Sequence, residues 1–119
     1  MKPQIDSTSF GCITIDGLEY NHDVLIRLSG SIEKRKKKLS KIIFGTSHIL
    51  SQDEAEFIYE EGVQTIFIGT GQYGELVLSD EARTYLESRC DVKPMYTIKA
   101  VVAYNLSAEK AVGLFHVTC

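Results

Sequence analysis

Paired cysteines, long apolar runs and low-complexity segments are all missing from this sequence. With only two prolines in 119 residues and no repetitive stretch, disorder over most of the chain is excluded. The three cysteines, Cys12, Cys90 and Cys119, are an odd number without a Cys-x-x-Cys spacing, so no disulfide framework is predicted. No stretch reaches the roughly 18 apolar residues that a membrane span needs. The first residues also lack the apolar part of a signal peptide, and we therefore expect a reduced, cytoplasmic protein.

Basic residues are scarce outside one segment. The chain has 13 Lys and Arg against 16 Asp and Glu, and six of the basic residues lie between Ser31 and Lys41 beside a single acid, Glu33. An acidic body with one basic segment argues against nucleic acid as a partner. The segment is predicted to be a solvated loop. Its functional alternative is a docking surface for an acidic partner or an anionic lipid headgroup.

The length and the order of apolar segments predict one domain, residues 1–119, of the α/β class. Two strands, 10–15 and 20–28, are predicted around an Asp16-Gly17 hairpin turn. A helix over 52–61 is indicated by a capping box of Ser51 and Glu54, with Gly62 after its end. Further along, the pattern predicts strand 64–68, helix 79–89, strand 91–96, helix 98–106 capped by Thr97, and strand 111–118. This order predicts a three-layer sandwich around a mixed central sheet, with an N-terminal β-hairpin.

Directly after the apolar strand 64–68 stands a glycine-rich hexapeptide: Gly69, Thr70, Gly71, Gln72, Tyr73 and Gly74. It matches G-x-G-x-x-G in form, but the next helix begins at Ser79 and no acidic residue follows at the offset of a dinucleotide site. Without Gly-Lys-Ser/Thr it is not a P-loop. Two interpretations stay open: a tight turn with positive φ and close backbone approach, or a contact for a small anion, a nucleotide phosphate or a partner.

Other reactive side chains show no local spacing that demands chemistry. His22, His48, His116 and Asp23 could bind a metal, but their spacing predicts ordinary hydrogen-bonded histidines, and no metal or cofactor is expected. A Cys–His nucleophile pair is the sharper enzyme hypothesis. On a strand His116 and Cys119 point to opposite faces, so His48 would have to be the base for Cys119.

Several short segments resemble, in order, a family spread over nearly the whole chain. They are Phe10-Gly11, Ile15-Asp16-Gly17, His22-Asp23-Val24, Gly45-Thr46-Ser47-His48, Ile68-Gly69-Thr70-Gly71-Gln72-Tyr73-Gly74, Tyr104-Asn105-Leu106 and His116-Val117-Thr118-Cys119. The family is the domain-of-unknown-function family 498/598, which includes mitochondrial complex I assembly factor 3 and the adipogenesis-associated single-domain protein. The resemblance implies a three-layer α/β fold on a mixed sheet, no established enzyme activity, and a member that acts by binding other assembly proteins.

These observations predict a non-enzymatic protein-interaction or assembly-factor-like module with a protein partner. The alternative is a small-anion or nucleotide-phosphate binding protein or enzyme that uses the same hexapeptide. A homo-oligomer stays open. The expected ligand or partner surface combines two segments, Thr46, Ser47 and His48 with Gly69, Thr70, Gly71, Gln72, Tyr73 and Gly74. An enzyme needs a concave pocket where they converge, whereas a binding module needs an exposed patch, with Tyr73 at its centre.

Overall fold

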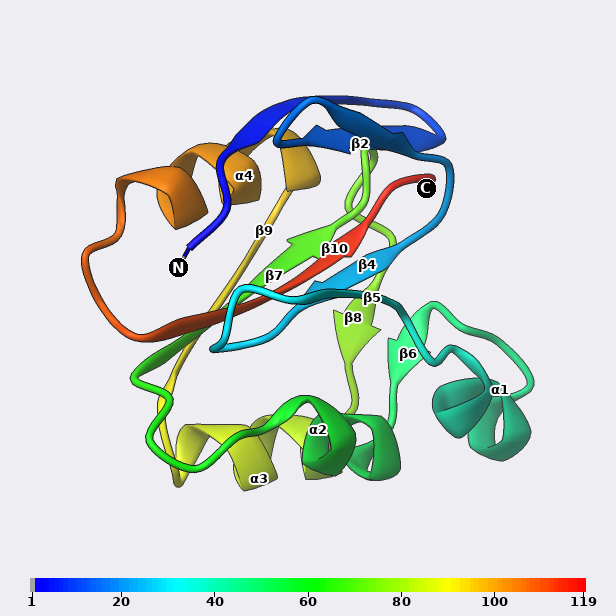
Figure 1. The fold of residues 1–119 in the computed structure, drawn as a ribbon. Helices are drawn as coiled ribbons and strands as arrows, with labels where there is room; N and C mark the ends of the chain where they lie inside the picture. Colours follow the sequence, from blue (N-terminus) through cyan, green and yellow to red (C-terminus); the bar gives the residue numbers. More distant parts are fainter. Residues whose placement is uncertain (1) are drawn as a thin grey trace.

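A five-stranded mixed sheet runs through the centre of the molecule (Figure 1), in a computed structural model that describes residues 2–119. Its strands lie in the order β5 (Ile32–Lys34), β4 (Val24–Ile26), β10 (Ala111–His116), β7 (Thr65–Thr70) and β9 (Asp91–Met95). The last three are parallel to one another, whereas β4 is antiparallel to both β10 and β5. The predicted mixed sheet is confirmed.

The N-terminal segment forms a separate antiparallel sheet of three strands, β1 (Ile5–Ser9), β2 (Cys12–Ile15) and β3 (Leu18–Tyr20). Strands β2 and β3 meet at the predicted turn, where Asp16 and Gly17 have φ of 48° and 81°. Positive φ at both central residues is the conformation that an Asp-Gly hairpin favours. The sequence did not predict β1, so the expected hairpin is part of a larger sheet.

Helices and the small sheet complete two outer layers. On one face of the central sheet lie α1 (Lys38–Phe44), α2 (Gln52–Ile58) and α3 (Asp80–Glu87), with the short parallel strands β6 (Ile49–Leu50) and β8 (Val77–Leu78) beside them. On the other face lie α4 (Thr97–Leu106) and the N-terminal sheet (Figure 1). The three-layer arrangement agrees with the predicted sandwich.

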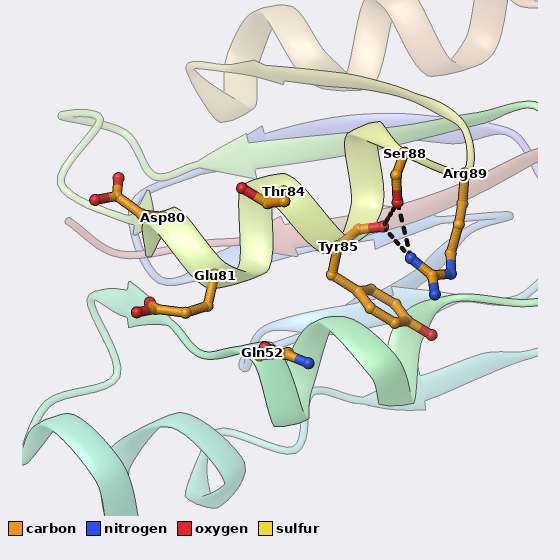
Figure 2. A pocket seen from close by; sticks show the side chains of 7 residues that line it. All are labelled: Gln52, Asp80, Glu81, Thr84, Tyr85, Ser88 and Arg89. Carbon is orange, nitrogen blue, oxygen red and sulfur yellow. Dashed lines mark hydrogen bonds between the residues drawn. The ribbon is translucent and has the colours of Figure 1, made fainter.

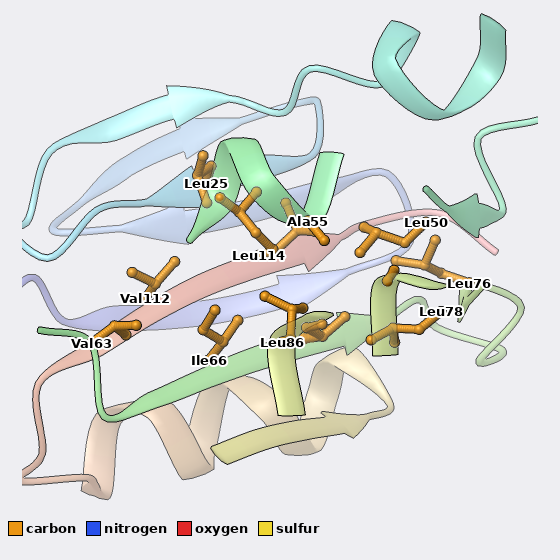
Figure 3. Close-up of a cluster of buried hydrophobic side chains, with 13 residues drawn as sticks. Leu25, Leu50, Ala55, Val63, Ile66, Leu76, Leu78, Leu86, Val112 and Leu114 are labelled. Carbon is orange, nitrogen blue, oxygen red and sulfur yellow. The ribbon is translucent and has the colours of Figure 1, made fainter. Parts of the chain in front are cut away.

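Two apolar cores lie between the central sheet and the outer layers, one on each face of the sheet. Side chains of the central strands point alternately into one core and the other. Ile66 and Ile68 of β7 belong to the core beneath α2 and α3 (Figure 3), together with Leu114 of β10. Phe67 and Phe115, on the opposite face, belong to the core shared with α4 and the N-terminal sheet. Because side chains on a strand alternate between faces, a nearly continuous apolar strand is the pattern of a sheet covered on both sides.

Helix ends agree with the sequence only in part. Ser51 and Ser79 cap α2 and α3, and their hydroxyls accept hydrogen bonds from the amides of Glu54 and Ala82 at 3.1 Å each. The predicted capping box is incomplete, because the Glu54 carboxylate turns into the protein interior instead. Helix α2 ends at Ile58, earlier than predicted.

The basic segment is the main error of the sequence-based prediction. It contains strand β5 and the start of α1 rather than a solvated loop. The side chain of Arg35 is fully buried. Within a run of charged residues, the local sequence does not indicate which side chain is buried in an ion pair. Only the tertiary contacts identify Arg35 as that residue.

Candidate functional site

The glycine turn, residues 69–74, lies where β7 leaves the central sheet, as its position after a buried strand predicts. Thr70 ends β7, and its carbonyl accepts a hydrogen bond from the amide of Leu76 at 3.0 Å, which closes the turn. Gly71 and Gly74 have φ of 109° and 73°, in the region that favours glycine. The backbone therefore reverses within a few residues beside the end of β10.

Each glycine of the motif is also a point of close approach. A Cβ on Gly69 would lie 2.7 Å from Oγ1 of Thr97, and one on Gly74 would lie 2.5 Å from the ring of Tyr96. At Gly71 the neighbour is backbone, since a Cβ would lie 2.2 Å from the carbonyl carbon of Cys119. The glycine pattern is thus explained by positive φ and tight contacts, which was the first of the two interpretations.

The amides at the centre of the turn bind groups of the same molecule. Gly71 donates to Oγ1 of Thr97 at 2.8 Å, and Gln72 donates to the carbonyl of Thr118 at 2.7 Å. The amide of Tyr73 donates to the carbonyl of Cys119 at 3.1 Å. An anion site built on this turn requires free N–H groups, and these three are not free. Thr97, which was predicted to cap a helix, instead lies inside α4 and holds the turn.

The segment Thr46, Ser47 and His48 lies just before β6, which pairs with β8 a few residues after the glycine turn. The hydroxyl of Thr46 accepts a hydrogen bond from the amide of His48 at 3.1 Å. The carbonyl of His48 accepts one from Val77 at 2.9 Å, where β6 and β8 pair. The carbonyl of Ser47 accepts a hydrogen bond from Arg35 at 2.8 Å. Through His48, this segment lies beside Glu75, the residue that follows the glycine turn.

A buried ionic network supports this segment from inside. The guanidinium of Arg35 contacts Glu54 through two bonds, of 2.7 and 3.1 Å, and Asp23 through a bond of 3.0 Å. Asp23 also pairs with Nδ1 of His116 at 2.8 Å, and Ser40 donates to Glu54 at 2.5 Å. These five residues are each at most 3% exposed. A buried charge is tolerated only with such partners.

The network also fixes the charges of Asp23 and Arg35. Burial by itself raises the pKa of Asp23, but contacts with His116, the amide of Val117 and the charge of Arg35 lower it to about 2. Burial likewise lowers the pKa of Arg35, but Glu54 and Asp23 outweigh it and raise that pKa. Both groups are therefore charged at neutral pH.

Three potential ligand side chains meet at the outer edge of this region. Nitrogen of His48, a carboxylate oxygen of Glu75 and Sγ of Cys119 lie within 4.8 Å of one another. His48 and Cys119 are half-buried and Glu75 is exposed. The ring of His48 packs edge-on against His116, with centroids 5.4 Å apart. The pairing of His48 with Cys119 considered from the sequence is thus close in space, with a carboxylate beside it.

A pocket lies elsewhere, over helices α2 and α3 (Figure 2). It is lined by Gln52, Asp80, Glu81, Thr84, Tyr85, Ser88 and Arg89. Its single cation, Arg89, donates to the carbonyl of Tyr85 at 2.8 Å and stacks over that ring. None of its lining residues belongs to the glycine turn or to the segment 46–48. This pocket therefore does not supply the concave site that an enzyme acting through those segments needs.

Sequence reasoning missed the roles of three residues of this region: Arg35, Glu54 and Glu75. Glu54 stood in a capping box, which already accounted for an acid at that position. Arg35 was hidden among neighbouring lysines, and Glu75 followed the glycine turn with no distinguishing spacing. Of the exposed aromatic residues near the turn, Phe10, Tyr73 and Tyr96, the sequence singled out only Tyr73 for a surface contact.

Within residues 2–119, no helix has the length and apolar character needed to cross a membrane.

The comparison with protein families finds one match, described as a protein of unknown function (DUF498/DUF598), over residues 5–115. This is the family that the short sequence segments predicted. The match covers residues 46–48 and the glycine turn, and it ends within β10.

Solved structures agree with this match. The chain is 36% identical to a conserved hypothetical protein from Pyrococcus horikoshii OT3, with a TM-score of 0.90 over 98% of this chain and 99% of that one. It is 30% identical to the protein MT938, with a TM-score of 0.85 over 99% and 100% of the two chains. A Mth938-like domain from Bordetella pertussis shares the fold at 16% identity, with a TM-score of 0.63 over 97% and 85%.

Proposed function

We propose that this protein is a non-enzymatic protein-interaction module. The chain belongs to the DUF498/DUF598 family of proteins of unknown function. The proposed binding surface is centred on the glycine turn and its neighbour His48. The partner that suits it is a protein segment with apolar side chains. The observation that carries this proposal is a cluster of exposed aromatic rings at the turn.

This aromatic cluster consists of Phe10, Tyr73 and Tyr96. Their exposed fractions are 57%, 68% and 53%, so each residue is more than half exposed to solvent. Phe10 and Tyr73 lie with ring centroids 5.9 Å apart, and Tyr96 packs against Gly74. Exposed aromatic groups that lie together favour a binding surface, because they offer large apolar area with few rotatable bonds.

The backbone beneath the cluster is held rigidly. Tyr73 is fixed by the hydrogen bond of its amide to Cys119, and the side chain of Gln72 donates to Oγ1 of Thr8 at 3.2 Å. The amide of Gly11, next to Phe10, donates to the carbonyl of Val117 at 2.8 Å. A surface that is ordered before binding loses less conformational entropy on association. This preorganisation supports a recognition role for the turn.

Two other exposed apolar groups provide matched controls. Ile98, Val102 and Leu106 recur every four residues along α4, with exposed fractions of 57%, 54% and 81%. Ile42 near the end of α1 is 85% exposed. Both groups are exposed and apolar like the aromatic cluster, but their side chains are aliphatic and lie on other elements. Variants at Leu106 and Ile42 therefore separate a specific surface from general adhesion of apolar residues.

The test begins with quantitative affinity purification from cells of the source organism, using wild type and the variants Tyr73→Ala, Phe10→Ala, Leu106→Ala and Ile42→Ala. A protein retained by wild type and by both controls, but lost from the two aromatic variants, is then purified. Direct titration is expected to show binding weakened by about 2 kcal/mol, or roughly 30-fold, for Tyr73→Ala.

The proposal is wrong if the aromatic variants retain every protein that wild type retains. It is also wrong if only Leu106→Ala or Ile42→Ala loses the partner, because the surface would then lie on a helix. Sedimentation of the same variants measures whether a second copy of the chain is the partner, which a homo-oligomer requires.

We also propose a cytoplasmic location. Cys12, Cys90 and Cys119 are free cysteines, and free thiols that are partly accessible suit a reducing compartment. Localisation of the tagged protein in its own cells tests this, with an oxidising compartment as the contrary result.

A further inference from the structure

Three side chains of the types that bind zinc meet beside the glycine turn. They are the imidazole of His48, the carboxylate of Glu75 and the thiol of Cys119, with ligand atoms within 4.8 Å of one another. They come from three separate segments: the loop before β6, the loop before β8, and the residues after β10. We propose that His48, Glu75 and Cys119 bind one Zn²⁺ ion.

Backbone hydrogen bonds hold the three segments in register. The amide of Glu75 donates to the carbonyl of Cys119 at 3.0 Å, which joins two of the ligands directly. Two residues further, Val77 donates to the carbonyl of His48 at 2.9 Å, and β6 pairs with β8 from Ile49 onwards. Each ligand is therefore anchored through its own backbone or that of a close neighbour. A metal site requires ligand residues whose backbone positions are fixed before the ion binds.

Gly71 has a role in this arrangement. A side chain there would collide with the backbone of Cys119 at 2.2 Å. Only glycine, with its φ of 109°, lets the segment after β10 lie against the turn and place Cys119 beside Glu75. The glycine motif thus positions the thiol rather than an anion.

The chemistry of the set favours zinc over the common alternatives. A thiolate is a soft ligand that magnesium and calcium avoid, whereas zinc accepts sulfur, nitrogen and oxygen together. One thiolate, one carboxylate and a neutral imidazole carry two negative charges, which match the charge of Zn²⁺. Three protein ligands leave a fourth position, and the exposure of Glu75 opens it to water.

The separation of the ligand atoms requires a modest closure. Tetrahedral zinc bonds of about 2.0–2.3 Å place ligand atoms about 3.3–3.8 Å apart, against at most 4.8 Å here. Glu75 is exposed and can rotate toward the other two ligands. The imidazole of His48 keeps its orientation by packing against His116, whose ring is held by Asp23.

The binding test uses the full chain after treatment with a chelator and removal of the chelator. Calorimetric titration with ZnCl₂ is expected to give one site per chain. The variants His48→Gln, Glu75→Gln and Cys119→Ser are each expected to lower zinc affinity by more than about 10-fold. Loss of a residue that only supports a ligand already lowers affinity by about 10-fold or more, and loss of the ligand itself lowers it further. The matched controls His22→Gln, Glu61→Gln and Cys90→Ser keep the wild-type affinity.

Cobalt provides a second readout of the thiolate. Titration with Co²⁺ is expected to give a sulfur-to-cobalt charge-transfer absorption that Cys119→Ser abolishes and Cys90→Ser retains. Saturating Zn²⁺ is also expected to slow alkylation of Cys119 by iodoacetamide, but not that of Cys12. Since Glu75 is exposed, Glu75→Gln remains folded and keeps the comparison valid, which urea unfolding verifies.

Several results overturn this proposal. The first is the absence of stoichiometric Zn²⁺ binding, and the second is a binding that Glu75→Gln and Cys119→Ser leave unchanged. The third is an alkylation rate of Cys119 that Zn²⁺ does not alter. None of these results bears on the aromatic cluster, so the partner surface stands or falls separately.

Discussion

Arg35 and Glu54 form a two-point ion pair in the interior, with Nε to Oε2 at 2.7 Å and Nη2 to Oε1 at 3.1 Å. Both side chains are fully buried, and the pair lies between the basic segment and helix α2. It joins two parts of the chain that the sequence predicted as a solvated loop and a helix whose Glu54 belongs to a capping box. The same guanidinium holds Ser47, next to the proposed zinc ligand His48.

Removing one partner of this pair leaves the other charge buried. We expect Glu54→Ala to lower the free energy of unfolding by about 3–5 kcal/mol. The control is Glu33→Ala, since Glu33 pairs with Arg27 at 3.2 Å but its side chain is 42% exposed. That pair is open to solvent on the Glu33 side, so it contributes about 0–1 kcal/mol. Urea unfolding measures both variants, and equal losses would contradict the role given to the buried pair.

The close approach at Gly71 predicts a position-specific glycine effect. Both Gly71 and Gly62 have positive φ, but a Cβ on Gly62 meets nothing within 4 Å. Gly62→Ala should therefore cost only the backbone strain, about 1–2 kcal/mol. Gly71→Ala should cost more and should also raise the reactivity of the Cys119 thiol, because the residues after β10 are displaced. Unfolding measurements and thiol titration test this, and equal effects at the two glycines would be the contrary result.

Thr97 joins three elements through one hydroxyl. Oγ1 accepts from Gly71 at 2.8 Å and donates to the carbonyl of His116 at 2.6 Å, in a fully buried position. Thr97→Val keeps the shape but leaves both partners unsatisfied, which should cost about 1–3 kcal/mol. Thr84→Val, at an exposed site on α3, is the control and should change stability little. Thermal and urea unfolding compare the two variants, and a neutral Thr97→Val would refute the linking role.

Acid is expected to weaken the fold through Asp23. Its pKa of about 2 in the folded protein lies below its ordinary value of 3.8, so the unfolded chain binds more protons between these values. The resulting stabilisation is present above about pH 5 and is lost as the pH falls toward 2, by about 2 kcal/mol. Carboxyl NMR titration of Asp23 measures its pKa directly. A midpoint at or above 3.8 would contradict the contribution assigned to His116 and Arg35.

Much of the fold could be predicted because its signals are local. The apolar strand before the glycine turn, the Asp16-Gly17 hairpin turn and the caps at Ser51 and Ser79 each act within a few residues. For the candidate site, the sequence singled out only two segments, residues 46–48 and 69–74. Its chemistry was not predicted, because the amides of the turn have partners that lie far along the chain.

The sequence by itself determined the layers, the mixed order of elements and the reversal at the glycine turn, since apolar alternation and turn residues act over short spans. Only the tertiary structure decided which charge is buried at Arg35, and that His48, Glu75 and Cys119 stand together. Such placements depend on the packing of segments that are distant in sequence. A local sequence pattern cannot predict such a contact, because the positions of both residues depend on how the strands of the sheet are arranged.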